Sequence, residues 1–286
     1  MRGRIYRIAG KGATCRAANI GGTGAADAAT RSDAPPAHPA HHRMPSRHFV
    51  DLPLRPGAEI ALPPGAARHV QVLRLQPGSP LVVFDGRGGE HAATVASMGR
   101  YEVRVRVGAH EPVERELARP VALAVGMPAN ERMDALIEKA TELGASAIVP
   151  LECERSVLRL HGERAQKRQA HWHGVAVAAA EQSGRTRLPA VQAVTTLPAW
   201  LQGLPAPDGT ARWLLDPGDA PPLASRLPAL GSAAVVLLSG PEGGLTPAER
   251  ALALAAGFVP VSLGPRVLRA DTAPLAALAC LGALAP

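Results

Sequence analysis

Cysteine and aromatic residues are scarce in this chain of 286 residues. The three cysteines, Cys15, Cys153 and Cys280, form no C-x-x-C pair. This pattern excludes a disulfide scaffold or a zinc ribbon and favours a reducing, cytoplasmic environment. Aromatic residues make up only 3% of the chain, which argues against an RNA-binding surface built mainly on stacked rings.

Long apolar runs and several nucleotide-binding motifs are also missing. No run reaches the roughly 18 apolar residues that a membrane-spanning helix needs, and the alanine-rich residues 272–285 predict a buried helix. The absence of a phosphate loop, of G-x-G-x-x-G after a strand and of a G-x-S-x-G elbow disfavours ATP-using, dinucleotide-dependent and serine-hydrolase chemistry. His171 and His173 lie on different faces of a predicted helix, so we expect no bound metal.

Positive charge is concentrated near the N-terminus. The net charge is +7, but residues 1–43 contain seven basic and two acidic residues, so the rest of the chain is nearly neutral. An RNA-binding role must therefore rest on local patches. Because residues 1–43 contain few large apolar groups, we expect either a disordered segment or a true start at Met44. A mitochondrial transit peptide, also rich in arginine and poor in acids, stays open.

Residues 44–115 predict a small β-barrel domain of a size typical of nucleic-acid-binding modules. Short β-type runs are separated by Pro and Gly turns, with one short helix near residues 65–73. In residues 101–107, Tyr101 and three valines alternate with charged residues, which predicts a half-buried strand with a mostly basic exposed face. Residues 111–120 are charged and bounded by proline, as in a linker.

Residues 120–286 alternate between β-type and helical segments, which predicts an α/β domain with a mostly parallel sheet covered on both faces. The predicted strands are 121–125, 147–151, 213–216, 234–239 and 259–263, and the predicted helices are 131–143, 164–182, 223–230, 247–256 and 272–285. Gly144 and Gly184 stand where glycines terminate helices.

Two loops that follow predicted strands are the strongest candidates for a functional site. Residues 239–249 contain Gly240 and Glu242 among further glycines, which let backbone groups approach a ligand closely. A tight turn before a capped helix would explain most of that loop but not Glu242. Residues 263–273 carry Arg266 and Arg269, a pair typical of anion or RNA-phosphate binding. A third polar cluster, 181–187, is equally compatible with an ordinary helix C-terminus.

These motifs, in this order, resemble those of the RsmE family, the ribosomal RNA uridine-N3 methyltransferases of the SPOUT superfamily. The resemblance extends over residues 47–285. The matching segments are Gly240-Pro-Glu-Gly-Gly244, Leu263-Gly-Pro-Arg-Val-Leu-Arg269, Arg132-Met-Asp134, Glu138-Lys-Ala-Thr-Glu-Leu-Gly144, Glu154-Arg-Ser-Val157, Trp172, Glu181-Gln-Ser-Gly-Arg185 and Phe49. This chain departs from the family in having Asp271 where a glutamate is usual and Ala129-Asn130 where Lys-Gly is usual.

The resemblance implies a PUA-like β-barrel over 44–115 and a SPOUT trefoil-knot domain over 120–286. It further implies a cytoplasmic homodimer that uses S-adenosyl-L-methionine to methylate N3 of one uridine in 16S rRNA of the small ribosomal subunit, with no metal and no membrane. The cofactor-binding candidates are Leu215, Ser239, Gly240, Pro241, Glu242, Gly243, Leu263, Gly264, Arg266, Leu268, Thr272 and Ala273. The RNA-binding candidates are Arg47, Arg74, Arg132, Arg185 and Arg187.

The catalytic candidates are Arg269, Arg266 and Glu242, with Arg185 of the facing subunit as an alternative cation. Uridine N3 must lose its proton to become a nucleophile, and a fixed cation stabilises the resulting negative charge. Either Glu242 or Asp271 could accept that proton or orient an arginine. Alternatively, both arginines hold only RNA phosphates or the cofactor carboxylate, and a non-catalytic RNA-binding or ribosome-assembly factor with the same fold is the competing function. The presence of Glu242 together with both arginines favours the enzyme.

Overall fold

The computed structural model describes residues 45–129, 131–206 and 208–284. The prediction of a disordered segment or a misplaced start at residues 1–43 lies outside these ranges. Within them, no helix is long and apolar enough to cross a membrane.

The first sheet has five strands in the order β1-β3-β4-β5-β2. β1 is parallel to β3, and the other neighbouring strands are antiparallel. Helix α1 contributes Ala66, Ala67 and Val70 to the core beneath the sheet. The elements are β1 (Arg47–Phe49), β2 (Glu59–Ala61), α1 (Pro64–Val72), β3 (Pro80–Phe84), β4 (Glu90–Met98) and β5 (Val103–Glu111).

Strand β5 shows the predicted alternation but begins later than predicted. Every second residue from Val103 to Val107 is buried, while Arg104 and Arg106 lie on the other face. Tyr101, which we expected on the buried face, is 84% exposed. It precedes the first paired residue of the strand, so the two-residue period of a pleated strand does not apply to it.

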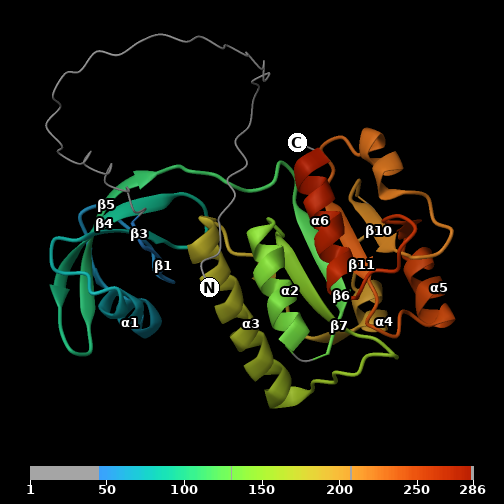
Figure 1. The fold of residues 1–286 in the computed structure, drawn as a ribbon, viewed down its shortest axis with the longest axis horizontal. Helices are drawn as coiled ribbons and strands as arrows, with labels where there is room; N and C mark the ends of the chain where they lie inside the picture. Colours follow the sequence, from blue (N-terminus) through green and yellow to red (C-terminus); the bar gives the residue numbers. More distant parts are fainter. Residues whose placement is uncertain (1–44, 130, 207, 285–286) are drawn as a thin grey trace, which may run out of the picture. The chain divides into compact units, whose positions relative to one another are not determined.

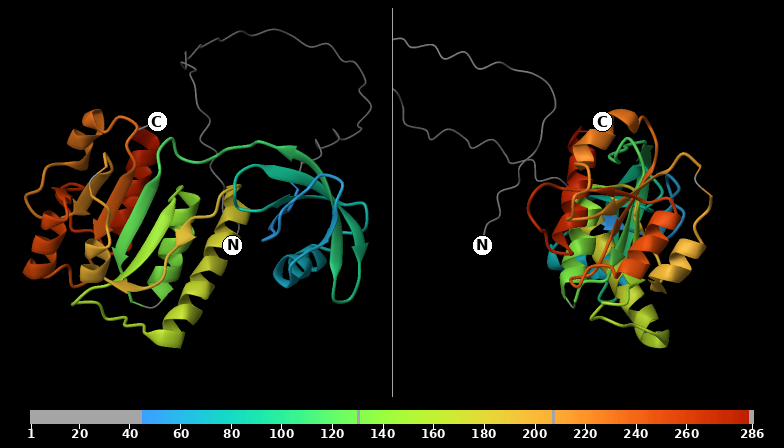
Figure 2. Two further views of the ribbon diagram at one scale, coloured as in Figure 1. Left: turned by 180° about the vertical axis from the view of Figure 1, so that it is seen from behind. Right: turned by 90° about the vertical axis from the view of Figure 1, so that its right-hand side faces the viewer.

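The second sheet has seven strands, all parallel to their neighbours, as predicted. Their order is β12-β10-β11-β6-β7-β8, with β9 also paired to β7. Figures 1 and 2 show the sheet between its helices. The elements are β6 (Val121–Gly126), α2 (Glu131–Glu142), β7 (Ala147–Glu152), α3 (Gly162–Ser183), β8 (Ala190–Val191), β9 (Thr195–Thr196), α4 (Leu197–Gln202), β10 (Ala211–Leu215), η1 (Leu223–Ala229), β11 (Val235–Ser239), α5 (Pro247–Ala255), β12 (Val259–Val261) and α6 (Thr272–Leu284).

Both faces of the parallel sheet are buried. In β6, Leu123 and Val125 belong to the core shared with α2, α3 and α6, whereas Ala124 belongs to the core shared with α4 and α5. Because successive side chains of a strand point to opposite faces, an uninterrupted apolar run such as β6 can supply both cores.

Local sequence signals fix several helix ends. Thr246 and Glu249 form the predicted capping box at the start of α5. Gly144 and Gly184 adopt left-handed backbone conformations, with φ of 95° and 86°, after α2 and α3. The predicted helix at 223–230 is instead the 3₁₀ helix η1, which contains Pro228. Proline lacks the N–H that an α-helix needs at an interior position, so the tighter, shorter helix forms there.

Candidate functional site

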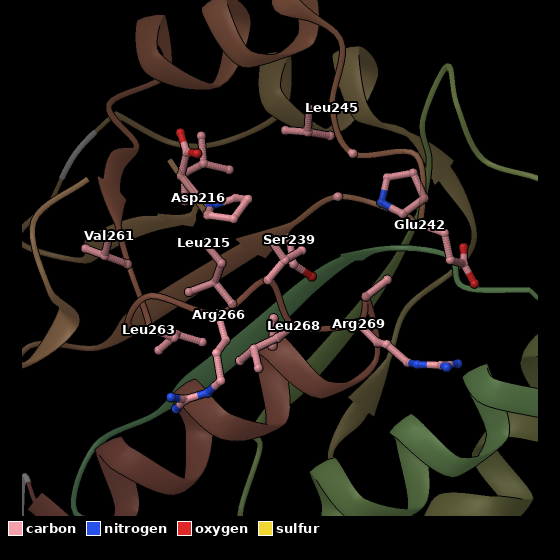
Figure 3. Close-up of a pocket in the computed structure, with 18 of the residues that line it drawn as sticks. Leu215, Asp216, Ser239, Glu242, Leu245, Val261, Leu263, Arg266, Leu268 and Arg269 are labelled. Atoms are coloured by element: carbon pink, nitrogen blue, oxygen red, sulfur yellow. The ribbon is translucent and has the colours of Figure 1, made fainter. Parts of the chain in front are cut away.

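The carboxyl ends of β10, β11 and β12 surround a pocket of about 560 Å³ (Figure 3). Three loops form most of its wall: residues 214–217 after β10, residues 239–245 after β11, and residues 261–273 after β12. Leucines dominate the apolar part of the lining, namely Leu214, Leu215, Leu245, Leu263 and Leu268. A ligand at this edge of the sheet occupies the position expected for open parallel sheets.

The loop after β11 is held tightly by its own backbone and by β6. A Cβ atom on Gly240 would stand 2.9 Å from Leu245 N, so only glycine fits this turn without displacing it. Ser239 lines the pocket, and its buried Oγ has no hydrogen-bond partner among the described residues. An unpaired buried hydroxyl is costly unless a ligand or water satisfies it, so the pocket suits a ligand with polar groups.

Glu242 is anchored to the segment that leads into α2. Its Oε1 accepts a hydrogen bond of 3.0 Å from Ala129 N and lies 3.5 Å from Arg132 Nη1. The side chain of Glu242 is 30% exposed. The carboxylate is therefore fixed in position while it remains open to the pocket.

Arg266 and Arg269 do not converge, although the sequence suggested a pair. Figure 3 shows their guanidinium groups pointing in opposite directions, with that of Arg269 on the same side of the pocket as Glu242. Both residues are exposed, and neither forms an ion pair within the described part of the chain. Arg269 is thus the arginine on the side of Glu242, and Arg266 lies on the opposite side.

Asp216 and Arg250 also line the pocket. The resemblance placed the cofactor against residues 215–217 without naming Asp216 as a site residue, and Arg250 was missed. Asp216 Oδ1 accepts a 3.0 Å hydrogen bond from Gly218 N, and its Oδ2 lies 3.0 Å from Arg250 Nε. The Asp-Pro-Gly sequence at the end of the predicted strand 213–216 was the available signal for Asp216, whereas Arg250 lies on a helix and has no such signal.

Most of the predicted cofactor-binding residues lie together in the structure. The pocket is lined by Leu215, Ser239, Gly240, Pro241, Glu242, Leu263, Gly264, Arg266, Leu268 and Ala273. Gly243 and Thr272 are not part of the lining. Gly243 packs against Arg155, whose Cβ would stand 2.9 Å from an added Cβ, and Thr272 is the first residue of α6.

Comparisons with known proteins agree on one family. A family model described as an RNA methyltransferase domain matches residues 115–282, and one described as an RNA methyltransferase PUA domain matches residues 62–108. The chain is 37% identical to ribosomal RNA small subunit methyltransferase E of Synechocystis over 229 residues, which is 79% of this chain and 74% of the relative. The chain belongs to the RsmE family.

Further RsmE proteins and solved structures support the assignment. The Bacillus subtilis protein is 33% identical, covering 74% of this chain and 84% of the relative. The crystal structure of the Neisseria gonorrhoeae protein bound to S-adenosyl methionine is 33% identical with a TM-score of 0.76, covering 83% of this chain and 96% of that one. A Legionella pneumophila methyltransferase with bound SAM has a TM-score of 0.78, 31% identity and the same coverage. The predicted fold class, a PUA domain followed by a SPOUT α/β domain, is confirmed.

The RNA-binding candidates of this RsmE-family chain lie in different environments. Arg132 lines the pocket. Arg74 is exposed and adopts a left-handed backbone conformation with φ of 56°. Arg187 is half exposed and pairs with Glu114 at 2.8 Å.

Arg185 and Arg47 require a correction, because both side chains are buried. Arg185 Nη1 donates to the backbone oxygens of Thr141 and Ala145, at 2.9 and 3.0 Å, and its Nε and Nη2 bind Glu116. With its hydrogen-bonding groups committed and only 3% of the residue exposed, Arg185 joins secondary-structure elements and does not present a surface to RNA.

Arg47 belongs to a neighbouring ion cluster between the two sheets. Its guanidinium pairs with Glu90 and donates a 2.9 Å hydrogen bond to Arg185 O. Arg115 also binds Glu90 and donates to Gly184 O at 2.7 Å. Burial by itself would raise the pKa of Glu90, but the hydrogen bonds from Arg115 and Arg47 outweigh it and hold the pKa below its usual value. We therefore assign Arg47 a structural role.

Proposed function

We propose that this protein transfers a methyl group from S-adenosyl-L-methionine to N3 of one uridine in 16S rRNA of the small ribosomal subunit. The observation that carries the proposal is the pocket at the ends of β10, β11 and β12, where the fixed carboxylate of Glu242 and the uncommitted guanidinium of Arg269 share one side. Membership of the RsmE family and the SAM-bound relatives support the same reaction.

The residues present fit the cofactor. Apolar side chains around Leu215, Leu263 and Leu268 offer a surface for the adenine ring. Ser239 Oγ supplies a hydrogen-bonding group without a partner among the described residues, and the loop at Gly240 exposes backbone where side chains are absent. When bound, S-adenosyl-L-methionine supplies an electrophilic methyl group. Arg266 lies on the side away from Glu242, and we assign it to bind the carboxylate of the methionine portion.

The acceptor side requires a base and a cation. Uridine N3 carries a proton, and after its loss the negative charge spreads onto the two flanking carbonyl oxygens. A guanidinium fixed beside those oxygens stabilises the charge as it develops, which is the role we give to Arg269. Glu242 accepts the proton in this scheme. Asp271, the alternative, is absent from the pocket lining, and its Oδ1 is buried without a partner in the described structure.

We propose that the protein acts as a homodimer in the cytoplasm, with α6 at the subunit interface. Helix α6 packs against α2 and the central strands β6 and β11, burying Ala277, Leu278 and Leu281. Apolar residues also occur on its other faces, where Leu284 is 60% exposed. A helix that is apolar nearly all round needs cover on more than one side, and a second subunit provides it.

Methyl transfer from radiolabelled S-adenosyl-L-methionine tests the proposal. Naked 16S rRNA and intact small subunits from cells that lack this modification are offered side by side, and the product RNA is digested to nucleosides. We expect label in 3-methyluridine with at least one of the two substrates. RNA binding without transfer to either substrate would favour a non-catalytic assembly factor, and label in another nucleoside would overturn the N3 assignment.

A further inference from the structure

A second, more open hollow of about 670 Å³ adjoins the pocket. It is lined by Ala129, Glu131, Arg132, Val157 and Glu242. Arg132 and Glu242 line both hollows, so the two spaces meet at this ion pair. The volume of the second hollow lies within the range of about 300–1,000 Å³ that is common for small-ligand sites. A ligand in the second hollow would therefore lie next to a ligand in the first, with Arg132 and Glu242 at the boundary between them.

The walls of this hollow combine three kinds of chemistry. Arg132 has a side chain that is 42% exposed, so donors remain available beyond its contact with Glu242. Both contacts that Glu242 makes with described residues use Oε1, so among these residues Oε2 remains available as an acceptor. Val157 adds an apolar surface, although 76% of this residue is exposed. A flat polar ring with its own donors and acceptors matches this combination.

We propose that the second hollow receives the acceptor base, turned out of the RNA, and that Arg132 and Glu242 select uracil over cytosine. This inference rests on the proposed function. The Watson–Crick edge of uracil presents an N3–H donor between two carbonyl acceptors. The N3–H matches the Glu242 carboxylate, one carbonyl matches the Arg132 guanidinium, and the other is left for Arg269 of the first pocket. In cytosine, N3 is an acceptor, so its lone pair would face the carboxylate. Enzymes that modify a base commonly extrude it from the stack in this way.

The position of the hollow explains why Glu242 is held by two groups. The Ala129 N–H and Arg132 fix the carboxylate at the boundary between the hollows, where the reacting nitrogen and the methyl group must meet. Val157 belongs to the loop between β7 and α3. In the same loop, Arg155 Nη1 donates a 3.0 Å hydrogen bond to Gly243 O. The apolar wall is thereby tied to the loop that carries Glu242.

Filling the hollow tests the proposal. Mass spectrometry of methylated RNA first identifies the acceptor uridine. Synthetic RNAs with uridine, cytidine or an abasic nucleotide at that position are then bound to the protein in the presence of S-adenosylhomocysteine. We expect wild type to prefer uridine over the abasic RNA by about tenfold, and Val157→Trp to remove most of that preference. Leu252→Trp, at a position of α5 that is 46% exposed and lies outside both hollows, should keep it.

Two further measurements separate the possible failures. Calorimetry with S-adenosylhomocysteine should give the same affinity for wild type and Val157→Trp, which shows that the first pocket is intact. Photocrosslinking of RNA with 4-thiouridine at the acceptor position should label the peptides that contain Arg132 or Val157. If wild type methylates the RNA but Val157→Trp keeps its preference, or if the crosslink falls outside both hollows, the base site is wrong. If wild type transfers no methyl group, the proposed function itself is overturned.

Discussion

Gly126 and Pro241 are in direct contact, with no space for a side chain between them. A Cβ atom on Gly126 would stand 2.5 Å from both N and Cδ of Pro241 and 2.9 Å from the carbonyl carbon of Gly240. Gly126 is the last residue of β6, and β6 pairs with β11, where Val125 is opposite Ser239. The end of β6 thus determines how closely the loop 239–245 approaches the sheet.

Gly126→Ala is therefore expected to displace that loop and to weaken cofactor binding. An added atom in a packed site costs about 1–3 kcal/mol when the surroundings must move, so S-adenosylhomocysteine affinity should fall by about tenfold in calorimetry. Gly174→Ala is the control, because a Cβ atom at that position of α3 meets nothing within 4 Å. An unchanged affinity in Gly126→Ala would show that the loop does not depend on this contact.

Gly240→Val is expected to abolish most cofactor binding. A side chain at position 240 would displace the loop that forms the pocket wall. A Cβ atom at Gly240 would stand 2.9 Å from Leu245 N and 3.1 Å from the Gly244 carbonyl carbon. We expect a fall of about tenfold or more in affinity with a loss of no more than about 3 kcal/mol in unfolding free energy. Calorimetry and urea unfolding measure the two quantities. Wild-type affinity in the variant would remove Gly240 from the cofactor site.

Arg185→Ala and Arg187→Ala should differ in stability and in RNA binding. Removing Arg185 leaves the Glu116 carboxylate and two buried carbonyl oxygens without their partner, which costs about 3–5 kcal/mol. The half-exposed Arg187–Glu114 pair should contribute no more than about 1 kcal/mol. Urea unfolding measures both. Only Arg187→Ala, if folded as wild type, should reduce the salt dependence of RNA binding. Equal stability of the two variants would contradict the structural role of Arg185.

The stability of the protein should fall as the pH drops from 6.5 to 4, partly because of His48. Burial, with a smaller effect from the charge of His69, lowers the pKa of His48 from 6.5 to about 4. The unfolded chain therefore binds a proton in this range that the folded protein does not, so stability is present above pH 6.5 and lost towards pH 4.

The His48 contribution is at most about 3 kcal/mol across this window. His48→Phe should flatten the pH dependence of the unfolding free energy between pH 4 and 6.5, measured by urea unfolding. His161→Phe is the control, since the His161 side chain is 76% exposed. An unchanged slope in His48→Phe would assign the acid sensitivity to other groups.

Arg269→Ala and Arg266→Ala should affect different kinetic constants. Arg269 points to the side of Glu242 (Figure 3), so its loss should lower kcat by about 100-fold at saturating RNA and cofactor. Arg266→Ala should raise the KM for the cofactor and leave kcat near wild type. Methyl-transfer kinetics at several salt concentrations separate these effects from lost phosphate contacts. If Arg269→Ala keeps kcat within a few-fold of wild type, Arg269 is a binding residue.

The sequence predicted those features that depend on neighbouring residues. The Thr246–Glu249 capping box spans three residues, and the strand-end loops around Gly240 carry their own signal. Arg185 could not be placed in this way, because its partner Glu116 is 69 residues away and its local surroundings are those of an ordinary polar helix end. The separation of Arg266 from Arg269 likewise depends on how the loop after β12 crosses the pocket, which their spacing does not encode.

The hydrogen bond from Ala129 N to Glu242 joins residues 113 positions apart. Contacts of this sequence separation form only after the entropy of closing the intervening chain has been overcome, and they slow folding. During synthesis, Ala129 leaves the ribosome 113 residues before Glu242, and the loop that follows β12 emerges later still. A newly made chain therefore lacks the complete pocket until the loop through Arg269 has been synthesised, although β6 and α2 are made much earlier.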